Sequence, residues 1–143
     1  MLPLDWVDTS GEMPAHTKEH ADRLAELRQY LSHSLAQSGI YAIVDPTPIA
    51  ADIERARAAQ PLDACNGCER DLARLVHADR VLVGEVDKVS TLIGSLRLSI
   101  IDVTSGRTVF ARVLGFRGDT DTAWDHAIQF FVRDLAASPP QAR

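Results

Sequence analysis

The chain has 143 residues, of which 45% are hydrophobic, enough for one domain with a substantial core. A net charge of -5 and scattered basic residues argue against a nucleic-acid or anionic-lipid surface, because both need clustered Lys and Arg. The apolar runs are too short to span a bilayer, and the amino terminus lacks the pattern of a secretion signal. We therefore expect either a cytosolic protein or the mature form of an exported one.

The first half of the chain predicts two strands and two helices. Residues 2–7 form a short apolar run that ends in polar residues, which is typical of a strand. Residues 19–37 are expected to be helical because leucines recur there at helical spacing, at Leu24, Leu27, Leu31 and Leu35. Residues 40–44 are interpreted as a second strand and the alanine-rich residues 50–59 as a second helix.

The second half predicts a helix, a meander of strands and a closing helix. Residues 68–77 are expected to be helical, and the strands follow at 81–89, 92–103 and 108–116. The closing helix, 122–136, places four apolar side chains on one buried face, namely Trp124, Ile128, Phe131 and Leu135. Thr122 and Asp125 are spaced like a capping box. The whole predicts a single α/β domain over 1–137 and a flexible tail at 138–143.

Right-handed crossovers arrange these elements as a three-layer α/β sandwich. The predicted sheet is mixed and five-stranded, of order 2-1-3-4-5, with strand 4 antiparallel and helices on both faces. The carboxyl ends of the other four strands then share one edge, where ligands bind in open α/β sheets. This candidate binding edge gathers mostly polar residues from distant segments: Asp8, Ser10, Asp87, Lys88, Ser90, Asp119, Asp121 and Trp124.

The two cysteines of the chain, Cys65 and Cys68, form a single C-x-x-C motif. In an oxidising compartment the pair is a short disulfide clip, closed by the turn residues between the two cysteines. In a reducing compartment it is a redox centre or half of a zinc site, whose other ligands would be His16 and His20, or His77. The disulfide is the leading interpretation.

The aspartates at the predicted edge have a structural and a functional interpretation. Between a strand and a helix, Asp usually caps the helix by accepting its free N–H groups. The alternative is a site for a hard cation such as calcium or a lanthanide; otherwise no cofactor is expected. Trp6 and Trp124 are expected in the core rather than as stacking platforms. No catalytic triad spacing or phosphate-binding loop is present in the sequence, so we expect no enzyme.

Several of these residues also carry a family resemblance. Asp8-Thr9-Ser10, the C-x-x-C pair and the G-D-T-D-x-x-W run that ends at Trp124 together resemble a family of small exported bacterial domains of unknown function. The layout is more distantly similar to the amino-terminal domain of TolB and to curli-assembly lipoproteins of the CsgG type. The resemblance implies a periplasmic location, an α/β sandwich and no known catalytic residues.

We therefore expect a non-enzymatic periplasmic accessory protein that binds a protein partner or takes part in envelope assembly. One alternative is a small-ligand or metal-ion-binding protein that uses the carboxyl-end crevice, and a third is a thiol-disulfide oxidoreductase. No nucleic-acid partner and no membrane span are expected. The sequence leaves the partner and the oligomeric state open.

Overall fold

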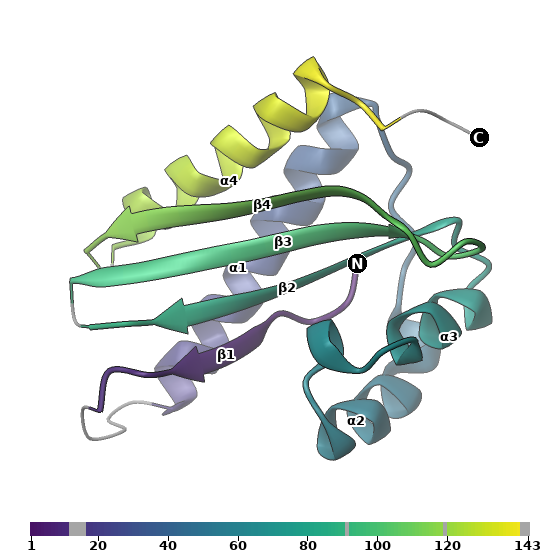
Figure 1. Cartoon of the computed structure of the whole chain (residues 1–143), viewed down its shortest axis with the longest axis horizontal. Coiled ribbons are helices and arrows are strands. Elements are labelled where there is room, and N and C mark those ends of the chain that lie inside the picture. Colours follow the sequence, from purple (N-terminus) through teal and green to yellow (C-terminus); the bar gives the residue numbers. More distant parts are fainter. Residues whose placement is uncertain (12–16, 91, 119, 141–143) are drawn as a thin grey trace.

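The structure is a computed structural model that describes residues 1–11, 17–90, 92–118 and 120–140 (Figure 1). Its elements in chain order are β1 Asp5–Asp8, α1 Thr17–Ser38, η1 Thr47–Ile49, α2 Ala50–Ala59, η2 Leu62–Ala64, α3 Cys68–Leu75, β2 Arg80–Lys88, β3 Ile93–Asp102, β4 Thr108–Arg117 and α4 Asp121–Ala137. The α/β class and the predicted helices are confirmed within a few residues at their ends. No described helix is long and apolar enough to cross a membrane.

The sheet of the described chain has four strands in the order β1-β2-β3-β4. β1 pairs with β2 in parallel, and Asp5 lies opposite Glu85. β3 runs antiparallel to both β2 and β4. The predicted meander and its antiparallel middle strand are therefore confirmed. The prediction of a five-stranded sheet of order 2-1-3-4-5 is wrong.

The predicted strand that does not form is residues 40–44. These residues are irregular and connect the end of α1 to η1. Ile40 and Tyr41 pack against the core, but Ile43 and Val44 are 36% and 38% exposed. A short apolar run becomes a strand only if a neighbouring strand offers its hydrogen-bonding edge. Here the apolar contacts of the first two residues hold the segment as an irregular connection instead.

α1 and α4 cover one face of the sheet, behind the strands in Figure 1. The core between these two helices and the sheet includes alternate residues of the strands, such as Val86, Leu96 and Leu98. The predicted buried face of the closing helix is confirmed, since its four apolar members are at most 3% exposed. The predicted capping box is wrong, because Thr120 is the N-cap and accepts from the Ala123 N–H, whereas Thr122 and Asp125 lie inside α4.

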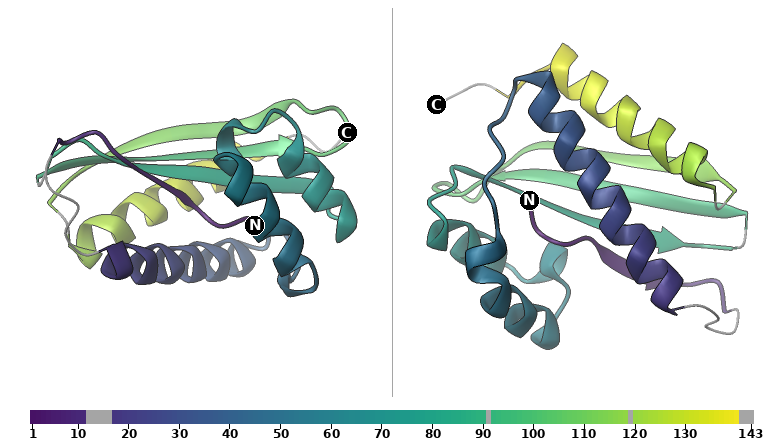
Figure 2. Two further views of the ribbon diagram at one scale, coloured as in Figure 1. Left: turned by 90° about the horizontal axis from the view of Figure 1, so that it is seen from below. Right: turned by 180° about the vertical axis from the view of Figure 1, so that it is seen from behind.

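α2 and α3 form a smaller layer near the start of β2 (Figure 2). Their core is a separate cluster that includes Ile53, Leu72, Val81 and Val83. The rest of this sheet face is not covered in the same way, and Val113 in β4 is 66% exposed. Helices therefore lie on both faces, as expected, but the second layer spans only part of the sheet.

Candidate functional site

The carboxyl ends of β1, β2 and β4 lie at one edge of the sheet, where the described parts of α1 and α4 also begin (Figure 1). This edge holds the described members of the predicted binding edge: Asp8, Ser10, Asp87, Lys88, Ser90, Asp121 and Trp124. Asp119 lies outside the described residues, as do His16 and the end of the expected tail, 141–143. Strand direction alone was thus enough to place these segments together.

The polar side chains of this edge mostly bind their local neighbours. The Ser10 N–H and hydroxyl both donate to Asp8 Oδ1, at 3.0 and 2.5 Å, and these bonds lower the pKa of Asp8. The Thr9 hydroxyl donates to Asp87 Oδ1 at 3.0 Å, which ties β1 to β2. Ser90 Oγ accepts from the Ile93 N–H at 3.1 Å and closes the β2–β3 turn. These contacts give each group a structural role.

The described carboxylates of this edge do not converge as a cation site would require. Asp121 lies 3.6 Å from Arg23, so its nearest charged partner is a cation of the protein itself. Within the described part of the chain, the groups of three potential metal ligands include none from this edge. Asp121 is also not the helix cap that the sequence predicted, because Thr120 takes that position.

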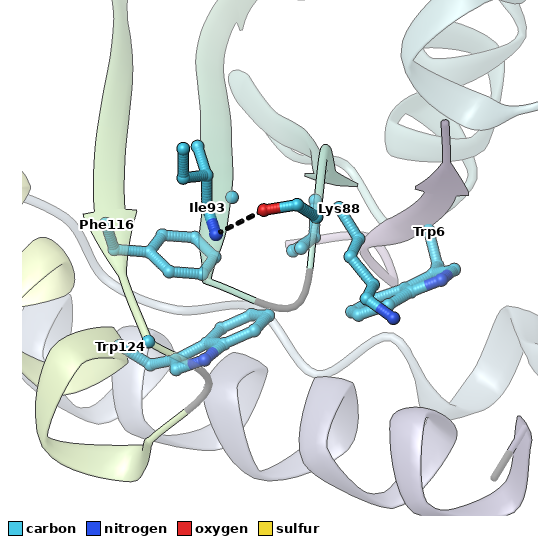
Figure 3. A pocket seen from close by; sticks show the side chains of 9 residues that line it. Trp6, Lys88, Ile93, Phe116 and Trp124 are labelled. Carbon is cyan, nitrogen blue, oxygen red and sulfur yellow. Dashed lines mark hydrogen bonds between the residues drawn. The ribbon is translucent and has the colours of Figure 1, made fainter. Parts of the chain in front are cut away.

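A small apolar pocket, with a cavity volume of about 20 Å³, opens at this edge (Figure 3). Its lining comes from β1, β2, β3, β4, the β2–β3 turn and α4, and consists of Trp6, Val86, Lys88, Ser90, Ile93, Gly94, Phe116, Gly118 and Trp124. The ring centroids of Phe116 and Trp124 are 4.6 Å apart. The ring of Trp6 stacks on that of His20, with 4.2 Å between the two centroids. Trp124 is only 3% exposed and its Nε1 has no hydrogen-bond partner among the described residues. The pocket is therefore an aromatic recess with Lys88 at its side.

Sequence reasoning found Lys88, Ser90 and Trp124 but missed the aromatic character of the site. The missed signal is the pair Gly94 and Phe116, which lie opposite each other in the β3–β4 register. A Cβ on Gly94 would come within 2.6 Å of Phe116 Cζ, so the glycine leaves room for the ring to lie across the strand. That signal depends on strand register, which a single sequence does not fix.

The β2–β3 turn beside the pocket exposes three large apolar side chains. Val89 is 47%, Leu92 68% and Ile93 53% exposed, and Ile93 also lines the pocket. An isolated exposed apolar residue is ordinary, whereas exposed apolar residues gathered beside an apolar recess are less common on a protein surface. The predicted polar edge thus carries an apolar surface, which we call the hairpin patch and define as Val89, Leu92, Ile93 and the pocket lining.

The second predicted site, the C-x-x-C pair, lies between η2 and α3. Cys65 and Cys68 are joined by a disulfide with their Cα atoms 5.5 Å apart, and Asn66 and Gly67 form the turn at φ 53° and 123°. The third potential ligand beside them is Glu69, whose buried Oε2 accepts from the Gly67 N–H at 2.9 Å. Of the zinc ligands that the sequence suggested, neither of the two described histidines joins the cysteines: His20 stacks on Trp6 at the pocket, and His77 is not part of the ligand group.

A third polar group, missed by sequence reasoning, joins η2 to the sheet. The Asp63 N–H donates to Asp5 Oδ2 at 3.2 Å, and Arg97 Nη1 lies 3.8 Å from Asp63 Oδ2 and 3.9 Å from Glu85 Oε1. Burial raises the pKa of Asp5 and of Glu85, and the charge of Asp63 raises the pKa of Glu85 further. These residues come from four segments, so only the folded register reveals them.

The fold and the edge define a mixed α/β domain with one full and one partial helical layer. The chain belongs to the family described as "Protein of unknown function (DUF2380)", whose profile matches residues 1–135. The expected membership of a family of unknown function is thereby confirmed, while the distant likeness to TolB and CsgG stays a prediction. No curated protein matches the chain.

Similar folds occur in solved structures of low sequence identity. A lipoprotein from Neisseria meningitidis, GNA1162, shares 12% identity with a TM-score of 0.59 and covers 96% of each chain. A variant of the PelC dodecamer from Paraburkholderia phytofirmans shares 17% identity with a TM-score of 0.51, over 98% of this chain and 86% of that one. The LpoB C-terminal domain from Escherichia coli aligns less well, with 14% identity and a TM-score of 0.48 over 78% and 79% of the two chains. The first two likenesses show a shared fold.

Proposed function

We propose that this chain is an accessory domain of the bacterial envelope that binds a protein partner through the hairpin patch. The observation that carries the proposal is the aromatic pocket of Trp6, Phe116 and Trp124 beside the exposed Leu92 and Ile93. Burial of these two side chains by a partner would remove a large apolar area from water, which is the main driving force of protein association.

The size and lining of the pocket favour a protein partner over a small ligand. Pockets for drug-sized ligands usually have about 300–1,000 Å³ and several convergent polar groups. This pocket has a cavity volume of only about 20 Å³ and an almost wholly apolar lining. It has room for no more than the tip of one apolar side chain, held while neighbouring residues of the partner cover the turn.

Two observations support an envelope location and a role in assembly. Disulfides persist in oxidising compartments such as the periplasm, and Cys65 and Cys68 are bonded to each other. The fold also recurs in a lipoprotein and in a protein that forms a dodecamer. Fractionation of cells that express the natural gene tests the location: a cytoplasmic product would contradict it.

Site-specific crosslinking tests the binding surface. A photo-reactive amino acid at Leu92, introduced in cells of the natural host, is expected to give a discrete crosslinked band on illumination. The same amino acid at Leu75, an exposed leucine in α3, is the matched control and is expected to give none. A band at twice the mass of the chain identifies a second copy as the partner.

The second arm of this experiment tests the pocket itself. Adding Ile93→Ser removes an exposed side chain that lines the pocket and is expected to reduce the Leu92 band about tenfold, which corresponds to ~1.4 kcal/mol of binding. Val113→Ser, a change at a somewhat more exposed residue of β4, is expected to leave the band unchanged. Equal crosslinking from Leu92 and Leu75, or no effect of Ile93→Ser, would refute the proposed surface.

A further inference from the structure

The Cys65–Cys68 disulfide contacts a buried carboxylate. Cys65 is 7% and Glu69 8% exposed, and Cys65 Sγ lies 3.1 Å from Glu69 Oε2. The same sulfur lies 3.2 Å from the Leu62 carbonyl oxygen. In the part of the chain that the structure describes, Glu69 is the titratable side chain at hydrogen-bond distance from this sulfur.

This contact differs from what a purely structural clip requires. A disulfide sulfur has no proton, so it donates nothing to the Glu69 oxygen, whereas a thiol at the same place would donate a hydrogen bond. Burial of a carboxylate is costly unless it is well hydrogen-bonded, and here the same Oε2 has the Gly67 N–H as its hydrogen-bond donor. The surroundings of Cys65 therefore gain a hydrogen bond when the disulfide is reduced.

The two sulfurs differ in access and in electrostatic setting. Cys68 is only partly buried, whereas Cys65 belongs to the buried set. Cys68 is also the first residue of α3, where the free N–H groups and the helix dipole favour a thiolate. A sulfur in that position is the one that an external thiol can attack and that later leaves most easily as a thiolate.

We propose that Cys65, Cys68 and Glu69 form a thiol–disulfide exchange centre whose substrates are dithiols of other proteins. A substrate thiolate attacks Cys68 Sγ, so that a substrate–Cys68 bond forms and the Cys65–Cys68 bond breaks. Cys65 Sγ leaves with the electron pair and takes up a proton, which reaches it from solvent through Glu69 Oε2. The second substrate thiolate then attacks the first substrate sulfur and releases the Cys68 thiolate. The substrate is oxidised by two electrons, and the protein gains a dithiol.

This activity goes beyond partner binding at the hairpin patch and does not rest on it. The exchange centre lies at the start of α3 and in the turn before it, on the partial layer, whereas the pocket lies at the carboxyl ends of β1, β2 and β4. The crosslinking result and the thiol chemistry can therefore fail separately.

Single-cysteine variants test the assignment of the two sulfurs. The aromatic disulfide 5,5′-dithiobis(2-nitrobenzoate) is expected to react with Cys68 in the Cys65→Ser variant at least about tenfold faster than with Cys65 in the Cys68→Ser variant. The absorbance of the released thiolate gives both rates. Equal rates, or a faster Cys65, would overturn the assignment.

The role of Glu69 is tested by reduction of the intact disulfide. Millimolar reduced glutathione is expected to reduce the folded wild-type protein, and Glu69→Gln is expected to slow this about tenfold or more, because the amide cannot relay a proton. Glutamine can still accept from the Gly67 N–H, so an unchanged thermal melt separates lost proton transfer from lost structure. The matched control Glu26→Gln, on the exposed side of α1, should reduce at the wild-type rate.

Two results would overturn the proposal. A wild-type disulfide that stays oxidised in glutathione while the protein is folded is a structural clip, and the exchange activity is then absent. A Glu69→Gln variant that is reduced at the wild-type rate removes Glu69 from the mechanism. If Glu69→Gln does not fold, the glutathione result for the wild type and the comparison of the two cysteine variants still decide the matter.

Discussion

Two carboxyl groups, on Glu85 in β2 and Asp63 in η2, share the guanidinium of Arg97 on the partly covered sheet face. The positive charge is more exposed to solvent than the two negative ones. The side chain of Arg97 is 57% exposed, whereas those of Asp63 and Glu85 are 8% and 15% exposed. Asp63 Oδ1 is buried and has no hydrogen-bond partner among the described residues. The sheet therefore carries a local electrostatic cost that depends on the protonation of Glu85.

The sign of the pH dependence follows from Glu85. Burial, then the charge of Asp63, raises its pKa in the folded protein, so the folded state holds the proton more tightly than the unfolded chain. Its contribution to stability is present below the unfolded pKa and is lost as the pH rises through the folded pKa. Asp5, whose pKa burial also raises, acts in the same direction.

We predict that Glu85→Gln raises the free energy of unfolding at pH 7, by up to about 1 kcal/mol, within the range that single stabilising substitutions commonly give. The exposed Arg97 contact that is lost contributes little. Denaturant melts between pH 4 and 8 measure the effect, which should vanish at the acid end. Glu26→Gln on α1 serves as the control and should shift nothing. A stability loss at pH 7 would show that the Arg97 pair outweighs the carboxyl repulsion.

At the scale of the elements, long periodic patterns were predictable and short ones were not. The leucines of α1 and the apolar face of α4 repeat over several turns, so a single helical interpretation fits them. Residues 40–44 offer only a few apolar positions, and their state is set by contacts of Ile40 and Tyr41 with the core. The polar edge was predictable because strand direction places the strand ends, but the pocket depends on the register that sets Gly94 against Phe116.

The start of α4 gives a sharp test of where this helix begins. The Ala123 N–H donates to Thr120 Oγ1 at 3.2 Å, and Asp121 is the acidic residue of the first turn. Thr120→Ala is expected to cost about 1 kcal/mol of stability, because a helix N–H loses its partner. Thr122→Ala should cost nothing or stabilise slightly, since alanine is the better residue inside a helix. Urea melts compare the two, and a larger cost at Thr122 would restore the capping box that the sequence suggested.

At the scale of the whole molecule, the described residues form two hydrophobic clusters on opposite faces of one sheet. β2 contributes to both, with Leu82 and Val86 on the α1–α4 side and Val81 and Val83 on the α2–α3 side. The smaller cluster holds two short helices and two 3-10 turns, and Cys68 packs against it. Its stability therefore depends more on local constraints than that of the larger cluster does.

We predict that removing the disulfide loosens only the smaller layer. The clip closes a loop of sequence separation 3, so the chain-entropy contribution is about 2 kcal/mol or less. In the Cys65→Ser, Cys68→Ser double variant, hydrogen exchange should accelerate in η2 and α3, while amides of β3 and of the centre of α4 keep their protection. The wild-type protein under oxidising conditions is the reference for each amide. A uniform loss of protection would show instead that β2 couples the two clusters into one cooperative unit, since that strand is the element that contributes buried residues to both.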